Sequence, residues 1–221
     1  MDEEDFAKQI GSNETGIYRR WSARLAAKYG RKQGWIRYHR YRMAYQLGWY
    51  AAFSRVYWSQ VTNLVFVCRG NISRSPYAEA RARVLGFPAT SYGLQANNAH
   101  PFDPIAQKVA EQLGIDMKRH RARLLERETF GSGMLLLAME PWQGARLQEF
   151  IRGTKAQVTL LGIWHTQPHP HIEDPWGLGE EYYRTCYMSI DSSVERVLSK
   201  IKTALPSEAK SCKGSSTFRF P

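Results

Sequence analysis

The stretch from Leu64 to Pro76, Leu-Val-Phe-Val-Cys-Arg-Gly-Asn-Ile-Ser-Arg-Ser-Pro, decides the fold of this chain. Its apolar, β-branched beginning predicts a buried strand that stops at Cys68. Arg74 follows after five intervening residues, and Ser75-Pro76 is typical of a helix start, with Ser75 as N-cap. A strand that leads through a short loop to a helix N-terminus forms a cradle for a phosphate group. A thiol on the floor of such a cradle indicates nucleophilic attack on phosphorus.

The residue types in this loop suit that chemistry. Cysteine attacks as the thiolate, which the helix N-terminus, the guanidinium of Arg74 and the hydroxyl of Ser75 would all stabilise. Gly70 lets successive backbone N–H groups turn inward as an anion-binding nest. The alternative is a buried structural cysteine at the end of a strand. The combined pattern favours Cys68 as a nucleophile.

Strand and helix patterns alternate from residue 63 onwards. Strands are predicted over 63–67, 89–92, 133–139 and 157–164, and helices over 76–85, 103–113, from about 142, and over 180–205. Such alternation predicts an α/β fold in which a parallel sheet is covered by helices on both faces. Residues 206–221 are predicted to be a flexible tail.

Residues 1–60 form an N-terminal extension of unusual composition. The chain has a net charge of +11, and residues 15–60 carry ten Lys or Arg, no Asp or Glu, and 12 of the 28 aromatic residues. An acidic start over residues 1–14 is predicted to be disordered. The spacing of Tyr41, Tyr45, Trp49, Phe53 and Val56 predicts a helix from about 35 to 57 with one apolar stripe.

Three kinds of partner suit this extension: an acidic protein, an anionic membrane surface, or the catalytic domain itself, with self-association as a further possibility. Nucleic acid is disfavoured because the basic residues are concentrated in one segment and not spread over a globule. The acidic start, the lack of an apolar run of 18 residues and the three cysteines (Cys68, Cys186, Cys212) predict a cytoplasmic protein, with a peripheral position on the inner membrane face if the extension binds lipid.

The loop resembles the signature of the low-molecular-weight protein tyrosine phosphatases, and the resemblance runs from about residue 61 to 205. Further landmarks appear in the right order: Gly93-Leu94-Gln95-Ala96, Asp103-Pro104 and His120-Arg121-Ala122-Arg123. The spacing is most similar to bacterial members associated with capsule and exopolysaccharide synthesis. The resemblance implies a four-stranded parallel sheet. It also implies a tyrosine-phosphorylated protein as partner, for example a tyrosine kinase of polysaccharide export.

The resemblance also implies the site residues. Cys68 would be the nucleophile, Arg74 the phosphate ligand, and Asp174 of Glu173-Asp174-Pro175-Trp176-Gly177 the general acid, in a loop at the same sheet edge as Cys68. The predicted substrate-binding residues are Arg69, Gly70, Asn71, Ile72, Ser73, Ser75 and Trp176. Ser91 and His120 would support Asn71 in a strained conformation. No metal or cofactor is implied.

Several alternatives stay open. A thiol arsenate reductase on the same scaffold would need further cysteines, and a non-catalytic phosphate-binding or scaffold protein would act through the extension. Ser73 stands where many relatives have a second loop cysteine. The phenyl ring of the substrate has Trp176, Tyr182 and Tyr183 as alternative walls. A metal site is one possible role for His165, His169 and His171. A rigid segment that leads to the Asp174 loop explains these histidines better.

Overall fold

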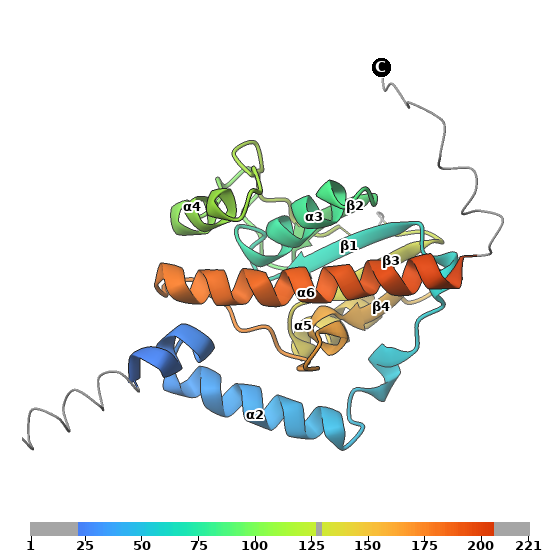
Figure 1. Cartoon of the computed structure of the whole chain (residues 1–221). Coiled ribbons are helices and arrows are strands. Elements are labelled where there is room, and N and C mark those ends of the chain that lie inside the picture. Colours follow the sequence, from blue (N-terminus) through green and yellow to red (C-terminus); the bar gives the residue numbers. More distant parts are fainter. Residues whose placement is uncertain (1–21, 127–129, 206–221) are drawn as a thin grey trace, which may run out of the picture.

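The computed structural model describes residues 22–126 and 130–205, and its centre is a four-stranded parallel sheet (Figure 1). The strands are β1 (Asn63–Cys68), β2 (Ala89–Gly93), β3 (Met134–Ala138) and β4 (Gln157–Leu160), in the spatial order β2-β1-β3-β4. All three strand pairs are parallel. The predicted α/β fold with helices flanking a four-stranded parallel sheet is therefore confirmed.

Alternate residues of β1 enter two separate hydrophobic cores. Leu64 and Phe66 face one core, whereas Val65 and Val67 face the other. Both faces of the strand are thus buried, which explains its uninterrupted apolar sequence. The first core is closed by α3 (Arg74–Val84), α4 (Pro104–Gln112) and the long α6 (Glu180–Ala204), and the second by α5 (Pro141–Phe150).

Two predicted elements have different limits in the structure. The helix after the loop begins at Arg74, so that Ser75 lies inside α3 and Ser73 is its N-cap residue. The fourth strand ends at Leu160, and η4 (Leu161–Trp164) follows as a 3₁₀ turn. Residues 161–164 are as apolar as a buried strand, and the hydropathy pattern could not separate the two.

The helix predicted over 35–57 is wrong in length. The structure has α2 (Lys32–Gln46), then η1 (Ala51–Ser54) and η2 (Trp58–Gln60). Gly48, with φ +81°, ends α2 because its N–H binds the Tyr45 carbonyl while the N–H of Trp49 binds the Ala44 carbonyl. These two hydrogen bonds form a Schellman motif, which needs a left-handed residue and stops the helix there.

Most of the predicted apolar stripe of the extension packs on the rest of the protein. Phe53 is buried in the second core, and Tyr45 and Tyr50 pack against that core. The Phe53 carbonyl accepts a hydrogen bond of 2.7 Å from Thr159 Oγ1 of β4. Trp49, by contrast, is 74% exposed because the chain leaves the helix before this position.

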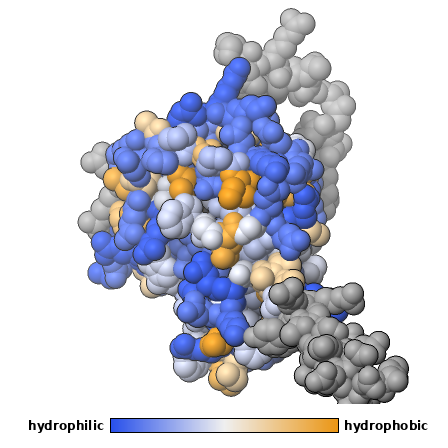
Figure 2. All heavy atoms as spheres, turned by 90° about the vertical axis from the view of Figure 1, so that its left-hand side faces the viewer, coloured by the Kyte–Doolittle hydropathy of each residue, from blue (hydrophilic) through white to orange (hydrophobic). Residues whose placement is uncertain are grey.

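The surface that faces left in Figure 1 is mostly hydrophilic, with hydrophobic residues in separate small patches (Figure 2). Within residues 22–126 and 130–205, no helix is both long enough and apolar enough to cross a membrane. The expected disorder of residues 1–14 and the expected tail over 206–221 lie outside the described residues.

Candidate active site

A pocket of about 270 Å³ opens where β1 ends. It is lined by loop residues and by three residues from elsewhere in the chain: Cys68, Arg69, Gly70, Ile72, Ser73, Arg74, Gln95, Asp174 and Trp176. The structure thus brings the three predicted catalytic residues to one pocket, although Asp174 is about a hundred residues further along the chain than Arg74. This is the carboxyl edge of the parallel sheet, where ligands bind in open α/β sheets.

The thiol of Cys68 has two close polar neighbours. The backbone N–H of Asn71 donates to its Sγ at 3.3 Å, and Ser75 Oγ lies 3.0 Å from the same sulfur. Both groups can donate hydrogen bonds to a thiolate, and the side chain is otherwise buried at the end of β1. The sulfur of Cys68 therefore lies beside two polar groups at the start of the loop.

Asn71 is the centre of the loop's hydrogen-bond network. Its backbone is left-handed, with φ 55°. Its side-chain amide donates to Ser75 Oγ and Ser91 Oγ, each at 2.9 Å, and its Oδ1 accepts from the N–H of Arg123 at 2.9 Å. His120 Nε2 lies 2.9 Å from the Asn71 carbonyl. The structure therefore brings Ser91 and His120 to Asn71, as the resemblance implies, and adds Ser75 and Arg123 to the network.

The carbonyl of Asn71 can only accept a hydrogen bond, so Nε2 of His120 carries a proton. Burial lowers the pKa of His120, which keeps the imidazole neutral near pH 7. Sequence reasoning missed the next member of this network. Glu79 of α3 is buried, accepts a 2.5 Å hydrogen bond from Ser91 Oγ, and pairs with Arg83 and Arg123.

Arg74 is almost fully buried and is held by three groups. Its Nη1 donates to Glu140 Oε1 at 2.7 Å and to the Ile172 carbonyl at 2.8 Å, and its Nη2 binds Asp174 Oδ2 at 2.7 Å. Burial opposes the charge of Arg74, but the Asp174 and Glu140 carboxylates outweigh it and raise its pKa. The guanidinium is therefore a fixed, permanent cation beside Cys68.

Glu140 was not predicted from the sequence. It follows β3 after one residue, Met139, and is the N-cap residue of α5. Burial opposes its ionisation, but Arg74 and His171 lower its pKa overall. An acidic residue immediately after a fully buried strand was a usable signal, because the ends of neighbouring parallel strands meet at one edge.

The rim of the pocket has an apolar side made by Ile72 and Trp176, the latter 62% exposed. Tyr182 and Tyr183, the other expected walls, are buried in the interior and do not line this pocket. Arg69 lies on the exposed rim, where its Nε donates to Gln95 Oε1 at 3.0 Å.

The three histidines of the segment before Asp174 bind different partners. His171 Nε2 lies 3.0 Å from Glu173 Oε2, His169 Nε2 lies 3.1 Å from Ser189 Oγ, and His165 Nδ1 contacts Gln167. Among the described residues there is no group of three or more His, Cys, Asp or Glu that could hold a metal ion.

A parallel α/β sheet with a cysteine-to-arginine loop at its carboxyl edge is typical of cysteine-dependent phosphatases, in which the loop and a helix N-terminus face the phosphate. The sequence model described as "Low molecular weight phosphotyrosine protein phosphatase" matches residues 63–207. The chain therefore belongs to the low-molecular-weight phosphotyrosine protein phosphatases, a family of hydrolases.

Individual relatives agree with this assignment. The chain is 31% identical over 127 residues to the low molecular weight protein-tyrosine-phosphatase Etp of Escherichia coli K12, covering 57% of this chain and 84% of Etp. It is 25% identical to the tyrosine phosphatase Wzb of E. coli K30, solved with sulphate, with a TM-score of 0.57 over 64% of this chain and 99% of Wzb.

The same fold also occurs in phosphatases with another named substrate. The YwlE arginine phosphatase of Geobacillus stearothermophilus is 23% identical, with a TM-score of 0.59 over 71% of this chain and 99% of YwlE. At this identity the likeness concerns the fold alone.

Proposed function

We propose that this phosphatase hydrolyses phosphotyrosine through a cysteinyl-phosphate intermediate, with Cys68 as nucleophile, Arg74 as phosphate ligand and Asp174 as general acid. The single observation that carries the proposal is the pocket that Cys68, Arg74 and Asp174 line together. In the first step the Cys68 thiolate forms a bond to phosphorus, the bond to the phenolic oxygen breaks, and Asp174 gives that oxygen its proton. In the second step Asp174 takes a proton from water, which attacks phosphorus and releases Cys68.

The ion pair between Asp174 and Arg74 must open for this reaction. Nη1 of Arg74 is held by Glu140 and the Ile172 carbonyl, whereas Nη2 is held by Asp174, whose side chain is 41% exposed. A bound phosphate would take the place of the Asp174 carboxylate at Nη2. Asp174 would then be free to turn towards the leaving oxygen, while Glu140 keeps the guanidinium in position.

The rim supports an aromatic leaving group. The phenol of tyrosine has a pKa of about 10, so its phenolate is a poor leaving group. An acid that protonates this oxygen therefore increases the rate substantially. Ile72 and Trp176 offer apolar surface to a flat ring, which suits tyrosine better than the charged guanidinium of phosphoarginine. The resemblance to bacterial phosphatases of capsule and exopolysaccharide synthesis supports a kinase of that process as the phosphorylated partner.

An arsenate reductase would need a second reactive thiol, and Cys186 is a poor candidate. Burial raises the pKa of Cys186 to about 12, so this thiol stays protonated. Its Sγ lies 3.8 Å from the Glu173 carbonyl, one residue before Asp174.

Hydrolysis of phenyl phosphate in EDTA tests the proposal directly. We expect turnover by the wild type, none by Cys68→Ser, and a fall in kcat/KM of about 10²- to 10³-fold in Asp174→Ala because the leaving phenolate is no longer protonated. Glu149→Ala is a control, since Glu149 lies on the surface of α5 in a pair with Arg146. An inactive wild type would contradict the phosphatase assignment, and an active Cys68→Ser would contradict the mechanism.

The substrate class has its own assay. The wild type should hydrolyse a phosphotyrosine peptide faster than the same peptide with phosphoarginine. The Trp176→Ala variant should lower this preference, because it removes apolar surface beside the ring. A preference for phosphoarginine would overturn the assignment to tyrosine while leaving the role of Cys68 intact.

A further inference from the structure

We propose that α2 of the N-terminal extension positions the general acid: Tyr41 and Arg37 hold the segment that carries Asp174. The proposal rests on the proposed role of Asp174 and concerns residues that lie outside the match to the phosphatase family, which begins at residue 63. Tyr41 and Arg37 would act as positioning residues, through His171 and Glu173, without touching the substrate.

The acid segment, residues 165–174, connects η4 with the turn that precedes α6. Its side chains fix each other near Asp174, because His171 Nε2 lies 3.0 Å from Glu173 Oε2. Glu173 is the residue directly before Asp174, so the position of its carboxylate limits the backbone on which Asp174 stands. Ile172 anchors the segment from below, with its side chain in the first core.

α2 covers this pair of side chains from outside. The ring of Tyr41 stacks on the imidazole of His171, with 4.7 Å between centroids and 6° between planes. Arg37, one turn earlier on α2, places Nη2 3.2 Å from Glu173 Oε1. Each member of the His171–Glu173 pair therefore has one partner on α2.

His171 is also linked to Arg74, the proposed phosphate-binding residue, through Glu140. His171 Nδ1 lies 3.9 Å from Glu140 Oε2, and the other oxygen of Glu140 binds Arg74. A displacement of His171 would therefore affect both Asp174, through Glu173, and Arg74, through Glu140. Asp174 is the more sensitive of the two, because Arg74 is buried and is also held by the Ile172 carbonyl.

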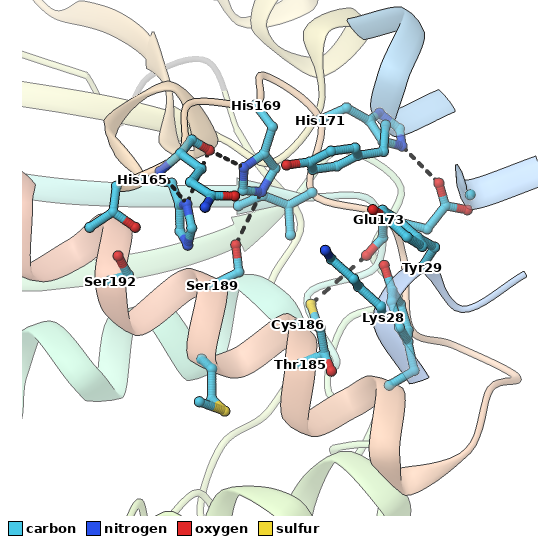
Figure 3. A pocket seen from close by; sticks show the side chains of 17 residues that line it. Lys28, Tyr29, His165, His169, His171, Glu173, Thr185, Cys186, Ser189 and Ser192 are labelled. Atoms are coloured by element: carbon cyan, nitrogen blue, oxygen red, sulfur yellow. Dashed lines mark hydrogen bonds and ion pairs between the residues drawn. The ribbon is translucent and has the colours of Figure 1, made fainter. Parts of the chain in front are cut away.

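A cavity beside the acid segment makes these contacts necessary. The cavity, of about 480 Å³, lies between the extension, the acid segment and α6. Figure 3 shows His165, His169, His171 and Glu173 along the segment, with Ser189 and Cys186 of α6 and Lys28 and Tyr29 of the extension around the same space. Where side chains do not fill the space, the segment is held by separate contacts and not by close packing.

α2 does not depend on Tyr41 for its place on the protein. Tyr45 and Tyr50 pack against the second core, and Phe53 is buried in it. A change at Tyr41 or Arg37 should therefore leave the helix docked, and Arg37→Ala also leaves intact the ring contact between Tyr41 and Tyr50, whose centroids lie 6.4 Å apart. This separation makes the proposal testable with single substitutions in the full chain.

The dependence of the rate on the leaving group is the deciding measurement. Loss of a well-placed acid slows the departure of a basic phenolate much more than that of p-nitrophenolate, which leaves without a proton. For Tyr41→Ala and for Arg37→Ala we expect kcat/KM to fall about tenfold with phenyl phosphate and less than about twofold with p-nitrophenyl phosphate. Tyr41→Phe, which keeps the stacked ring, should restore the wild-type ratio.

Arg40→Ala is the matched control, because Arg40 is an exposed arginine of the same helix. Equal losses on both substrates, or no loss on either, would overturn the proposal. If one variant fails to fold, as seen by thermal unfolding, the other gives the same test through its own contact. An inactive wild type would instead contradict the proposed function, so the two failures can be told apart.

Discussion

Asn71 combines a strained backbone with three side-chain hydrogen bonds inside the phosphate loop. An L-residue at φ 55° is disfavoured by about 1–2 kcal/mol relative to its ordinary conformations, and asparagine tolerates this region better than most residues. The bonds to Ser75, Ser91 and the Arg123 N–H hold it there. At the scale of the residue, these bonds therefore fix the conformation of the loop that we propose as the phosphate-binding site.

Two substitutions at Asn71 separate strain from hydrogen bonding. Both Asn71→Gly and Asn71→Ala remove the three side-chain hydrogen bonds. Glycine tolerates a positive φ, whereas alanine at this φ is strained. We expect both to lower the free energy of unfolding, and Asn71→Ala to be the less stable of the two by about 1 kcal/mol. Urea unfolding measures the difference. Equal stability of the two variants would mean that the loop relaxes out of the left-handed conformation.

At the scale of the element, α2 shows how a local signal can overrule periodicity. Apolar residues recur at helical spacing from Tyr41 to Val56, yet the helix ends at Gln46. Gly48 ends it, and Phe53 reaches the core from a separate 3₁₀ turn. A glycine that follows a helix at a positive φ is a stop signal, and the apolar residues beyond it belong to another element.

A Gly48→Ala variant tests this stop signal. The added Cβ would meet no atom within 4 Å, so any loss of stability comes from the backbone conformation at φ +81° and not from a clash. We expect the free energy of unfolding to fall by about 1 kcal/mol. Gly131→Ala is the control, because that position is equally open and has no positive φ, and chemical denaturation compares the two. If Gly48→Ala has the same free energy of unfolding as the wild type, the positive φ at this cap is not needed for stability.

The sequence predicted the structure best where all the residues of a motif lie close together in the chain. The loop from Cys68 to Arg74 and the strands beside it could be predicted because their patterns are complete within a few residues. Glu140 and Glu79 could not, since each acquires its role from a partner distant in the chain, Arg74 and Ser91 respectively. The contacts of Tyr41 and Arg37 with the acid segment were unpredictable for the same reason.

At the scale of the whole molecule, the extension and α6 together enclose an ionisable side chain, that of His169. His169 is buried between the extension and α6: its ring centroid lies 5.4 Å from that of Tyr38, and its Nε2 is 3.1 Å from Ser189 Oγ. Burial, assisted by His165, His171 and Arg42, lowers the pKa of His169 from 6.5 to about 4. The folded protein therefore holds this imidazole neutral.

This depressed pKa predicts a loss of stability in mild acid. Below pH 6.5 the unfolded chain binds a proton at His169, whereas the folded protein binds it only near pH 4. The free energy of unfolding therefore has its full His169 contribution above pH 6.5 and decreases as the pH falls from 6.5 to about 4. The slope from one such group is at most about 1.4 kcal/mol per pH unit. His169→Gln should flatten the pH dependence of unfolding, whereas His100→Gln, at an exposed position, should not. Identical slopes in wild type and His169→Gln would contradict the assignment.

The Asp174 carboxylate is paired with Arg74, so in the proposed mechanism it competes with the phosphate product for the same guanidinium. Asp174 is linked to the pocket by the chain, so its carboxylate faces Arg74 at a high effective concentration that does not change with the surroundings. In the proposed mechanism, inorganic phosphate left after turnover competes with this carboxylate for the guanidinium, which would speed product release. A ligand would then bind for longer only if contacts beyond its phosphate, such as those of an aromatic ring, add to its affinity.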